Sequence, residues 1–170
     1  MHPNPVYHSQ SQLANLAFAR ERAFGVLAVN GSDGPLLSHV PFLLDEDGQT
    51  VWLHLVRSNP IVRALKSPQP CRIAVSGPDS YVSPDWYGMP DQVPTWNYAA
   101  VELEGRVRRM DAEGLLGQIT ALSDKHEARV AAGKPWTMDK LPEAKSRALQ
   151  AGIVGFELEI MGWRETIKLS

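Results

Sequence analysis

The chain has 170 residues, of which 44% are hydrophobic and 21% charged, and its formal net charge is −2 with a pI of about 6.2. This length fits one domain with a substantial core, so we expect residues 1–170 to form a single domain. The slightly acidic balance and the scattered arginines and lysines argue against a nucleic-acid binder, which usually carries a basic surplus or a basic stripe.

The first twelve residues are polar and lack the apolar segment of a signal peptide. No apolar run approaches the ~20 residues that a membrane-spanning helix needs. We therefore expect a soluble, cytoplasmic protein. A first helix is expected over residues 11–22, where apolar side chains fall at helical spacing and Ser9 or Ser11 can cap the start.

Short apolar segments then follow one another in quick succession. Strands are expected over residues 24–29, 36–44 and 51–57. The segments between them, 30–34 and 45–48, are rich in Gly and Asp, which favour tight turns. Strands at this spacing indicate an antiparallel meander.

The second half of the chain mixes both periods. Residues 80–83 either extend the strand before them or begin another. The expected elements are a short helix at 60–65, a strand at 71–76, a loop at 84–94, a strand at 98–110, a helix after Asp111, a loop around 133–136, a helix at 143–152 ended by Gly152, and a strand at 153–160.

The predicted fold is mainly β with helices, with six or seven strands and three or four flanking helices. Strands and helices do not alternate as βαβ units, so a Rossmann sheet is not expected. A closed or nearly closed antiparallel barrel leaves few exposed edges for so many short strands, and we expect that architecture.

The single cysteine, Cys71, begins the apolar run CRIAV. One cysteine forms no disulfide within the chain and no thiolate-rich metal site, which suits a reducing compartment. No histidine or acid lies near it in sequence, so we expect a buried structural thiol.

The segment HLVRSNPIVRAL places polar groups between a strand and a helix. Arg57 ends the strand, Ser58 and Asn59 are good helix caps, and Pro60 suits the first helical position. With Arg63 nearby, the arginines, hydroxyl, amide and free N–H groups suit a phosphate. The alternative is an ordinary helix cap with two surface arginines.

The segment LLSHVPFLLD interrupts an apolar strand with Ser38 and His39, followed by Pro41. Proline cannot donate to a strand ladder, so this place is an edge, a bulge or a wall that faces a ligand. The alternative is a buried histidine bonded to a neighbouring carbonyl.

The segment SPDWYGMPDQVPTWNY gathers aromatic and small polar side chains before a long strand. Aromatic rings cover flat ligands, and small polar groups bond a ring edge or a phosphate. A hydrophobic lid or a dimer interface is the alternative. The residues concerned are Trp86, Tyr87, Thr95, Trp96, Asn97 and Tyr98.

The five histidines do not show HxH or HxxxH spacing, and His39 and His54 are the two that lie on successive predicted strands. A zinc site needs three or more ligands, so we expect no metal site. The sequence shows neither a G-x-S-x-G elbow nor a P-loop.

Several segments together resemble the PaiB-like family, whose members are described as FMN-binding negative transcriptional regulators. They are SHVPFLLD, HLVRSNP, SPDWY with VPTWNY, KPWTMDKLP and IVGFELEI, which cover nearly the whole chain in order. Members of the family resemble the split β-barrels of the pyridoxamine-phosphate-oxidase type, which are homodimers with FMN at the subunit interface.

Residue by residue, the resemblance implies three groups of FMN contacts. The second strand would contact the flavin, the corner before the short helix would hold the phosphate, and the VPTWNY block would close the site, from the same chain or its partner. The three groups are Ser38, His39, Val40 and Pro41; Arg57, Ser58 and Asn59; and Thr95, Trp96 and Asn97.

The chain departs from the family pattern at three places. Family members often have an aromatic residue shortly after the Asn-Pro pair, where this chain has Ile61, Val62 and Arg63. They often have a histidine after the Asn-Tyr pair, where this chain has Glu102, and they tend to continue with a polar, basic tail past Ser170.

The resemblance leaves three functions to weigh. The first is an FMN-binding protein, with an oxidoreductase activity in which the flavin does the redox chemistry and His39 is the one candidate acid or base. The second is a transcriptional repressor that acts on DNA directly or through a partner, although the sequence shows no helix-turn-helix pattern. The third is a haem-binding protein with His39, His54 or His126 as axial ligand.

Overall fold

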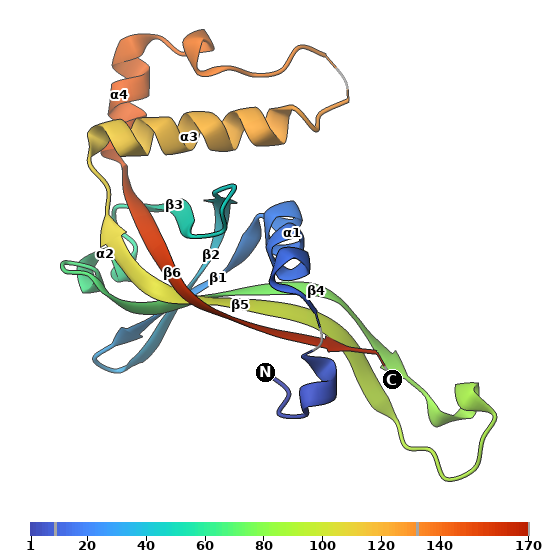
Figure 1. Cartoon of the computed structure of the whole chain (residues 1–170). Helices are drawn as coiled ribbons and strands as arrows, with labels where there is room; N and C mark the ends of the chain where they lie inside the picture. The colour runs from blue at the N-terminus through green and yellow to red at the C-terminus, as the bar shows by residue number, and fades with distance from the viewer. Residues whose placement is uncertain (9, 132, 170) are drawn as a thin grey trace.

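The computed structural model describes residues 1–8, 10–131 and 133–169. Its strands are antiparallel and close into a barrel in the order β1–β2–β3–β6–β5–β4, which confirms the predicted architecture (Figure 1). The strands are β1 (Phe24–Gly31), β2 (Gly34–Leu44), β3 (Thr50–Val56), β4 (Gln69–Val82), β5 (Thr95–Arg109) and β6 (Ile153–Lys168).

Helices cover one side of the barrel and one of its ends. In Figure 1, α3 and α4 form a layer beside the barrel, and α2 lies at the barrel end opposite the tip of the β4–β5 hairpin. The α-helices are α1 (Gln12–Arg22), α2 (Pro60–Ala64), α3 (Ala112–Glu127) and α4 (Glu143–Ala151), and the 3-10 turns are η1 (Pro5–Tyr7), η2 (Pro84–Tyr87) and η3 (Met138–Lys140).

The start of α1 agrees with its predicted cap. The Ser11 side chain accepts a hydrogen bond from the Ala14 amide at 3.2 Å, which satisfies one of the first free N–H groups of the helix. Ser9, the other predicted cap, lies outside the described residues.

The core fills the barrel interior and continues under α2. Alternate residues of each strand point inward, as the period of two predicts. Ile61 and Val62 of α2 are buried against the same cluster, so this short helix closes the barrel end. The largest fully buried side chains of the strands include Phe42, Phe156, Leu27, Leu53, Ile73, Leu103 and Leu158.

The barrel is split between β2 and β3. Their ladder comprises the pairs Phe42↔Leu53, Leu43↔Trp52 and Leu44↔Val51, so residues 34–41 of β2 lie outside it. Pro41, which has no N–H to give, stands where this ladder stops. We call residues 34–41 the β2 edge.

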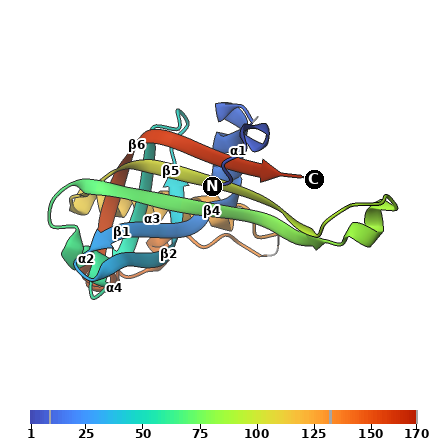
Figure 2. The same ribbon diagram turned by 90° about the horizontal axis from the view of Figure 1, so that it is seen from below.

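On the far side of the barrel, β4, β5 and the end of β6 form a projecting extension (Figure 2). The β1–β4 pairing runs from Val29↔Cys71 to Val26↔Ala74, whereas β4 continues to Val82. Residues 80–83 therefore largely extend β4, past an irregularity of register between Ser76 and Asp79.

Strand β6 is longer than predicted, because it continues past Ile160 to Lys168. The register shifts there: Gly105 pairs with Ile160 and Glu104 pairs with Gly162, which leaves Met161 as an extra residue. Such a bulge reverses the phase of the inward-pointing side chains. Among the described residues, no helix combines the length and the apolar character needed to cross a membrane.

Candidate functional site

The corner predicted to hold a phosphate lies between β3 and α2. Asn59 caps α2, and its Oδ1 accepts a hydrogen bond from the Ile61 amide at 2.9 Å. Pro60 occupies the first turn, where the missing N–H costs nothing. Ser58 is exposed beside this cap. The local sequence therefore fixes a rigid corner whose outer side is open to solvent.

The same asparagine connects the corner to the β2 edge. Its Nδ2 donates a hydrogen bond to Ser38 Oγ at 3.1 Å, across the split between β2 and β3. Both side chains are half-buried. Two groups that the sequence analysis selected from separate segments, 21 residues apart, thus lie in direct contact.

Arg57 stands at this corner but points away from β2. Its backbone N–H donates to Gly152 O at 2.8 Å, its Nε to Ala151 O at 2.6 Å and its Nη2 to Ile153 O at 2.9 Å. These carbonyls belong to the end of α4 and the start of β6, and β3 lies between β6 and β2 in the barrel. The guanidinium therefore ties the corner to the α4–β6 junction.

The four predicted residues of the second strand divide between its two faces. Ser38 and Val40 point inward, and Val40 is only 2% exposed, so its side chain belongs to the core. His39 is exposed and Pro41 is half-buried on the outer face. A flat ligand on that face would meet the His39 and Pro41 side chains, and Val40 only through its backbone.

The third predicted group lies on the extension, far from the other two. His39 pairs with Val26 of β1, Val26 pairs with Ala74 of β4, and Ala74 pairs with Glu102 of β5. His39 and Glu102 therefore lie at the same height of the barrel. Trp96 lies six residues before Glu102, a distance of about 20 Å along the strand at ~3.3 Å per residue. Within one chain, residues 95–97 are therefore not brought to the β2 edge.

Local contacts hold this part of the extension in place. Lys168 Nζ donates to Thr95 Oγ1 and, at 2.8 Å, to Trp96 O. The Trp96 ring meets the Tyr81 ring edge-on, with centroids 6.0 Å apart, and is 56% exposed. Asn97 is half-buried. The extension thus presents an aromatic surface that its own chain leaves open.

A groove that the sequence analysis did not foresee adjoins the corner. It has a volume of about 580 Å³ and lies between α2 and the turn that joins β1 to β2. Leu36 of the β2 edge and Pro60 line it, each next to the Ser38–Asn59 contact, and the exposed Arg63 lines it as well. The tight turn at 30–34 was predicted, but its approach to α2 depends on the closure of the barrel.

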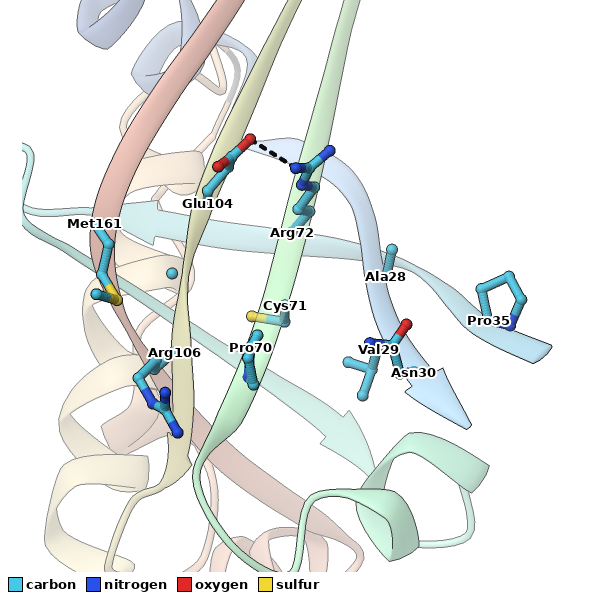
Figure 3. Close-up of a pocket in the computed structure, with 11 residues that line it drawn as sticks. Ala28, Val29, Asn30, Pro35, Pro70, Cys71, Arg72, Glu104, Arg106 and Met161 are labelled. Atoms are coloured by element: carbon cyan, nitrogen blue, oxygen red, sulfur yellow. Dashed lines mark ion pairs between the residues drawn. The ribbon is translucent and has the colours of Figure 1, made fainter. Parts of the chain in front are cut away.

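A second groove, of about 670 Å³, lies over β1, β4 and β5 and contains none of the predicted contact residues (Figure 3). Arg72 lines it and forms ion pairs with Glu104 at 2.9 Å and with Glu102 at 3.4 Å. Arg106, which is exposed, lies at its edge. Because acidic partners already neutralise Arg72, this groove is less suited to an anion.

Cys71 also faces this region and is the buried thiol that the sequence predicted, with 7% of the residue exposed. Burial raises the pKa of its thiol to about 12, because the thiolate would lose its hydration. The group is therefore a neutral thiol at physiological pH. Within the described ranges, the structure gathers no group of three or more His, Cys, Asp or Glu side chains able to hold a metal ion.

Comparisons with known proteins identify the family of this chain. A family model described as "Putative FMN-binding domain" matches residues 1–162. The chain is 28% identical over 155 residues to the protease synthase and sporulation protein PAI 2 of Bacillus subtilis, an alignment that covers 90% of this chain and 73% of that protein. It is 32% identical over 129 residues to an uncharacterized protein of Saccharomyces cerevisiae, with 68% and 76% covered.

Solved structures of similar fold include proteins named for flavin and haem. The FAD and haem binding protein from Mycobacterium smegmatis superposes with a TM-score of 0.68 at 16% identity, covering 96% of this chain and 74% of that one. The flavocytochrome Anf3 from Azotobacter vinelandii superposes with a TM-score of 0.66 at 15% identity, covering 100% and 73%. At these identities the likeness concerns the fold.

Proposed function

Because this chain belongs to the FMN-binding family whose model matches residues 1–162, we propose that it binds FMN along the β2 edge and the corner before α2. The observation that carries the proposal is the Asn59–Ser38 hydrogen bond, which joins the corner to the β2 edge at 3.1 Å. The split between β2 and β3 leaves the backbone of residues 34–41 outside the β3 ladder, where a planar ligand can reach it.

The donor set at the corner fits the ribityl phosphate end of FMN. The Ser58 hydroxyl is exposed, and the Asn59 amide and Ser38 hydroxyl are half-buried but reachable. These groups are uncharged, and a cation would also be needed to balance the charge of the phosphate. Arg57 and Arg63 are the nearest cations in sequence. The outer face of the β2 edge offers His39 and Pro41 to the flavin ring.

Bound FMN supplies electron- and hydride-transfer chemistry at its ring. The residues of this chain bind the nucleotide and orient it: the corner fixes one end, and the rigid strand fixes the plane of the other. His39 is exposed beside the proposed ring position and is the candidate for moving a proton there.

The corner is tested by titrating the protein with FMN and following the flavin band near ~450 nm. Asn59→Asp keeps an oxygen that caps α2 but loses the donor to Ser38 and adds a negative charge. We expect FMN affinity to fall at least about tenfold, as for the loss of one charge-assisted contact.

Asn4→Asp is the matched control. Asn4 caps the η1 turn, where its Oδ1 accepts from the Val6 amide at 3.1 Å, so the same change of side chain occurs far from the corner. Its FMN affinity should equal that of the wild type. Wild-type protein that leaves the flavin spectrum unchanged at millimolar FMN would refute the proposed function.

We also propose that residues 1–170 act as one domain in the cytoplasm and form a homodimer with the flavin at the interface. The extension projects beyond the barrel, with Trp86 71% exposed and Trp96 56% exposed. Exposed aromatic residues of this kind are typical of interfaces. In the dimer, residues 95–97 of one copy would close the site of the other.

The mass in solution tests the dimer. Light scattering should give twice the mass of 18.8 kDa. Trp96→Ala should weaken FMN binding without altering the fold, whereas Leu149→Ala, an equally exposed residue of α4 at 56%, should not. A monomeric protein whose Trp96→Ala variant binds FMN as tightly as the wild type would contradict this arrangement.

Haem binding is a second candidate, favoured by the exposed His39 and by the two structural neighbours whose names include haem or cytochrome. An imidazole on an open face is a suitable axial ligand. Added haemin should then give a Soret band that His39→Ala abolishes and His126→Ala retains. An unchanged band in the His39 variant would exclude this ligand.

The name of the Bacillus relative concerns protease synthesis and sporulation, which favours a regulatory role as a third proposal. Because the chain has a net charge of −2, it has no surplus of positive charge to attract DNA. We therefore place that role in contacts with a partner protein rather than in direct DNA binding. A gel-shift assay at low salt should leave duplex DNA unretarded, and a retained complex would reverse this assignment.

A further inference from the structure

Two arginines frame the corner, and the structure gives them different surroundings. The backbone and guanidinium of Arg57 donate to three consecutive residues, 151–153, at 2.6–2.9 Å. Cations at the end of a helix are stabilised by its free carbonyl groups. Arg57 therefore holds the corner against the α4–β6 junction, and the cost of moving it includes three hydrogen bonds.

Arg63 instead lines the groove of about 580 Å³ beside α2. It belongs to the last turn of α2 and is exposed, and Ile61 and Val62 beside it are buried, which fixes the helix under it. Gln69 Nε2 donates to Ala64 O at 2.7 Å and holds the end of the same helix. The guanidinium thus stands on a rigid base beside an open groove.

The order of the groups along β2 connects this groove to the flavin site. Three groups follow one another along β2 from Pro41 toward the start of the strand. His39 comes first, on the outer face, and the Asn59–Ser38 contact comes next. Leu36 comes last and lines the groove together with Pro60. Ser38 and Pro35 are three residues apart, about 10 Å at ~3.3 Å per residue. A ribityl chain that starts at a ring over Pro41 and His39 therefore reaches the groove with its phosphate.

The charges that face the groove include one of each sign. Arg63 is the cation, and Asp33 of the β1–β2 turn is the anion, with the Ser32 hydroxyl donating to its Oδ2 at 2.9 Å. Asn30, Ser32 and Gln69 add neutral polar groups. A bound phosphate is attracted by Arg63 and repelled by Asp33, so the two residues should affect its affinity in opposite directions.

We propose that Arg63 recognises the phosphate of the flavin nucleotide in the groove beside α2, and that Arg57 is a positioning residue that holds the corner in place. This inference rests on the proposed FMN-binding function. It assigns the phosphate to a cation that the family resemblance did not include and removes Arg57 from the set of direct contacts.

Riboflavin and FMN differ by the phosphate alone, so the pair isolates its recognition. Both are titrated into the full-length protein, and quenching of flavin fluorescence gives the affinities. In Arg63→Gln, FMN affinity should fall about 10- to 100-fold, as expected for a charge-assisted contact, while riboflavin affinity stays within about twofold. Asp33→Asn should instead tighten FMN about two- to fivefold and leave riboflavin unchanged.

Arg57→Gln should lower the melting temperature and weaken FMN and riboflavin by the same factor, because it loosens the corner as a whole. Arg106→Gln, an exposed arginine on the other groove, controls for the loss of one positive charge and should change neither affinity. Wild-type FMN affinity should decrease with added salt, and this dependence should be smaller in Arg63→Gln.

The inference is overturned if Arg63→Gln weakens both flavins equally or leaves FMN unchanged, or if Arg57→Gln weakens FMN selectively. These results differ from a failure of the proposed function, in which the wild-type protein binds neither flavin. Wild-type protein that binds riboflavin and FMN equally tightly would keep the flavin site and reject a phosphate contact at Arg63.

Discussion

Replacing Gly105 with alanine should strongly destabilise the barrel, because the backbone of the neighbouring strand occupies the space of the new methyl group. Gly105 lies in β5 beside the bulge at Met161 of β6. A Cβ built on it would lie 2.0 Å from Glu159 O and 2.8 Å from Leu158 Cδ2. The carbonyl oxygen is part of a strand backbone, so it cannot move aside like the end of a flexible side chain.

The size of the effect follows from that overlap. Real Cβ atoms keep at least 3.0 Å from such a neighbour, so β5 and β6 would have to separate locally by about 1 Å. Ladder hydrogen bonds of ~2.9 Å would then exceed their useful length. Overpacking costs ~1–3 kcal/mol and each weakened backbone bond ~0.5–1.5 kcal/mol, so we expect a loss of at least about 3 kcal/mol.

Urea and thermal unfolding followed by circular dichroism measure this loss. At ~2–4 °C per kcal/mol for a chain of this size, the melting temperature should fall by about 6–12 °C. Gly117→Ala is the matched control: Gly117 lies within α3, a Cβ there meets nothing within 4 Å, and alanine favours helix by ~0.5–1 kcal/mol. If Gly105→Ala unfolds within about 0.5 kcal/mol of the wild type, the account of β5–β6 packing is wrong.

Three further changes test separate parts of the fold. Cys71 should react with thiol reagents at pH 8 only after unfolding. Because its pKa is raised from 9.0 to about 12, its contribution to the free energy of unfolding is complete below pH 9 and is lost as the pH rises from 9 toward 12. Cys71→Ala should remove this decrease of stability with pH. Lys168→Met should speed amide hydrogen exchange in residues 95–98, since Lys168 holds Thr95 and the Trp96 carbonyl, and equal exchange would contradict that role. Asp111→Ala should cost ~0.5–2 kcal/mol by removing the α3 cap at Gly114, and Asp111→Asn should restore most of it.

The elements that the sequence predicted well are those whose signal is local. Ser11 predicts the start of α1, and the structure shows it as the cap. The alternation of apolar residues predicts β5, and the structure buries Val101, Leu103 and Val107 on one face. The end of β6 was missed because the bulge at Met161 reverses the alternation. The period of two that begins at residue 154 therefore breaks after residue 160 in the sequence, although the strand continues to Lys168.

The candidate site shows the same division between local and distant information. The cap at Asn59 and the edge position of Pro41 follow from residue type, and the structure places both as expected. The partners of Arg57 and the groove beside Arg63 come from segments 94 and more residues away or from barrel closure, which the sequence pattern does not encode. An arginine next to a cap looks the same in sequence whether it binds a ligand or a carbonyl.

The two predicted halves of the site lie at opposite ends of the barrel, and this separation supports the proposed dimer. The corner before α2 and residues 95–97 cannot meet in one chain without bending β5, whose pairing with both β4 and β6 makes it stiff. In the proposed dimer, a two-fold axis would bring the extension of each copy to the corner of the other, and both sites would close at once. The exposed Trp96 and the open β2 edge, each incomplete alone, would then form one binding site built from rigid parts.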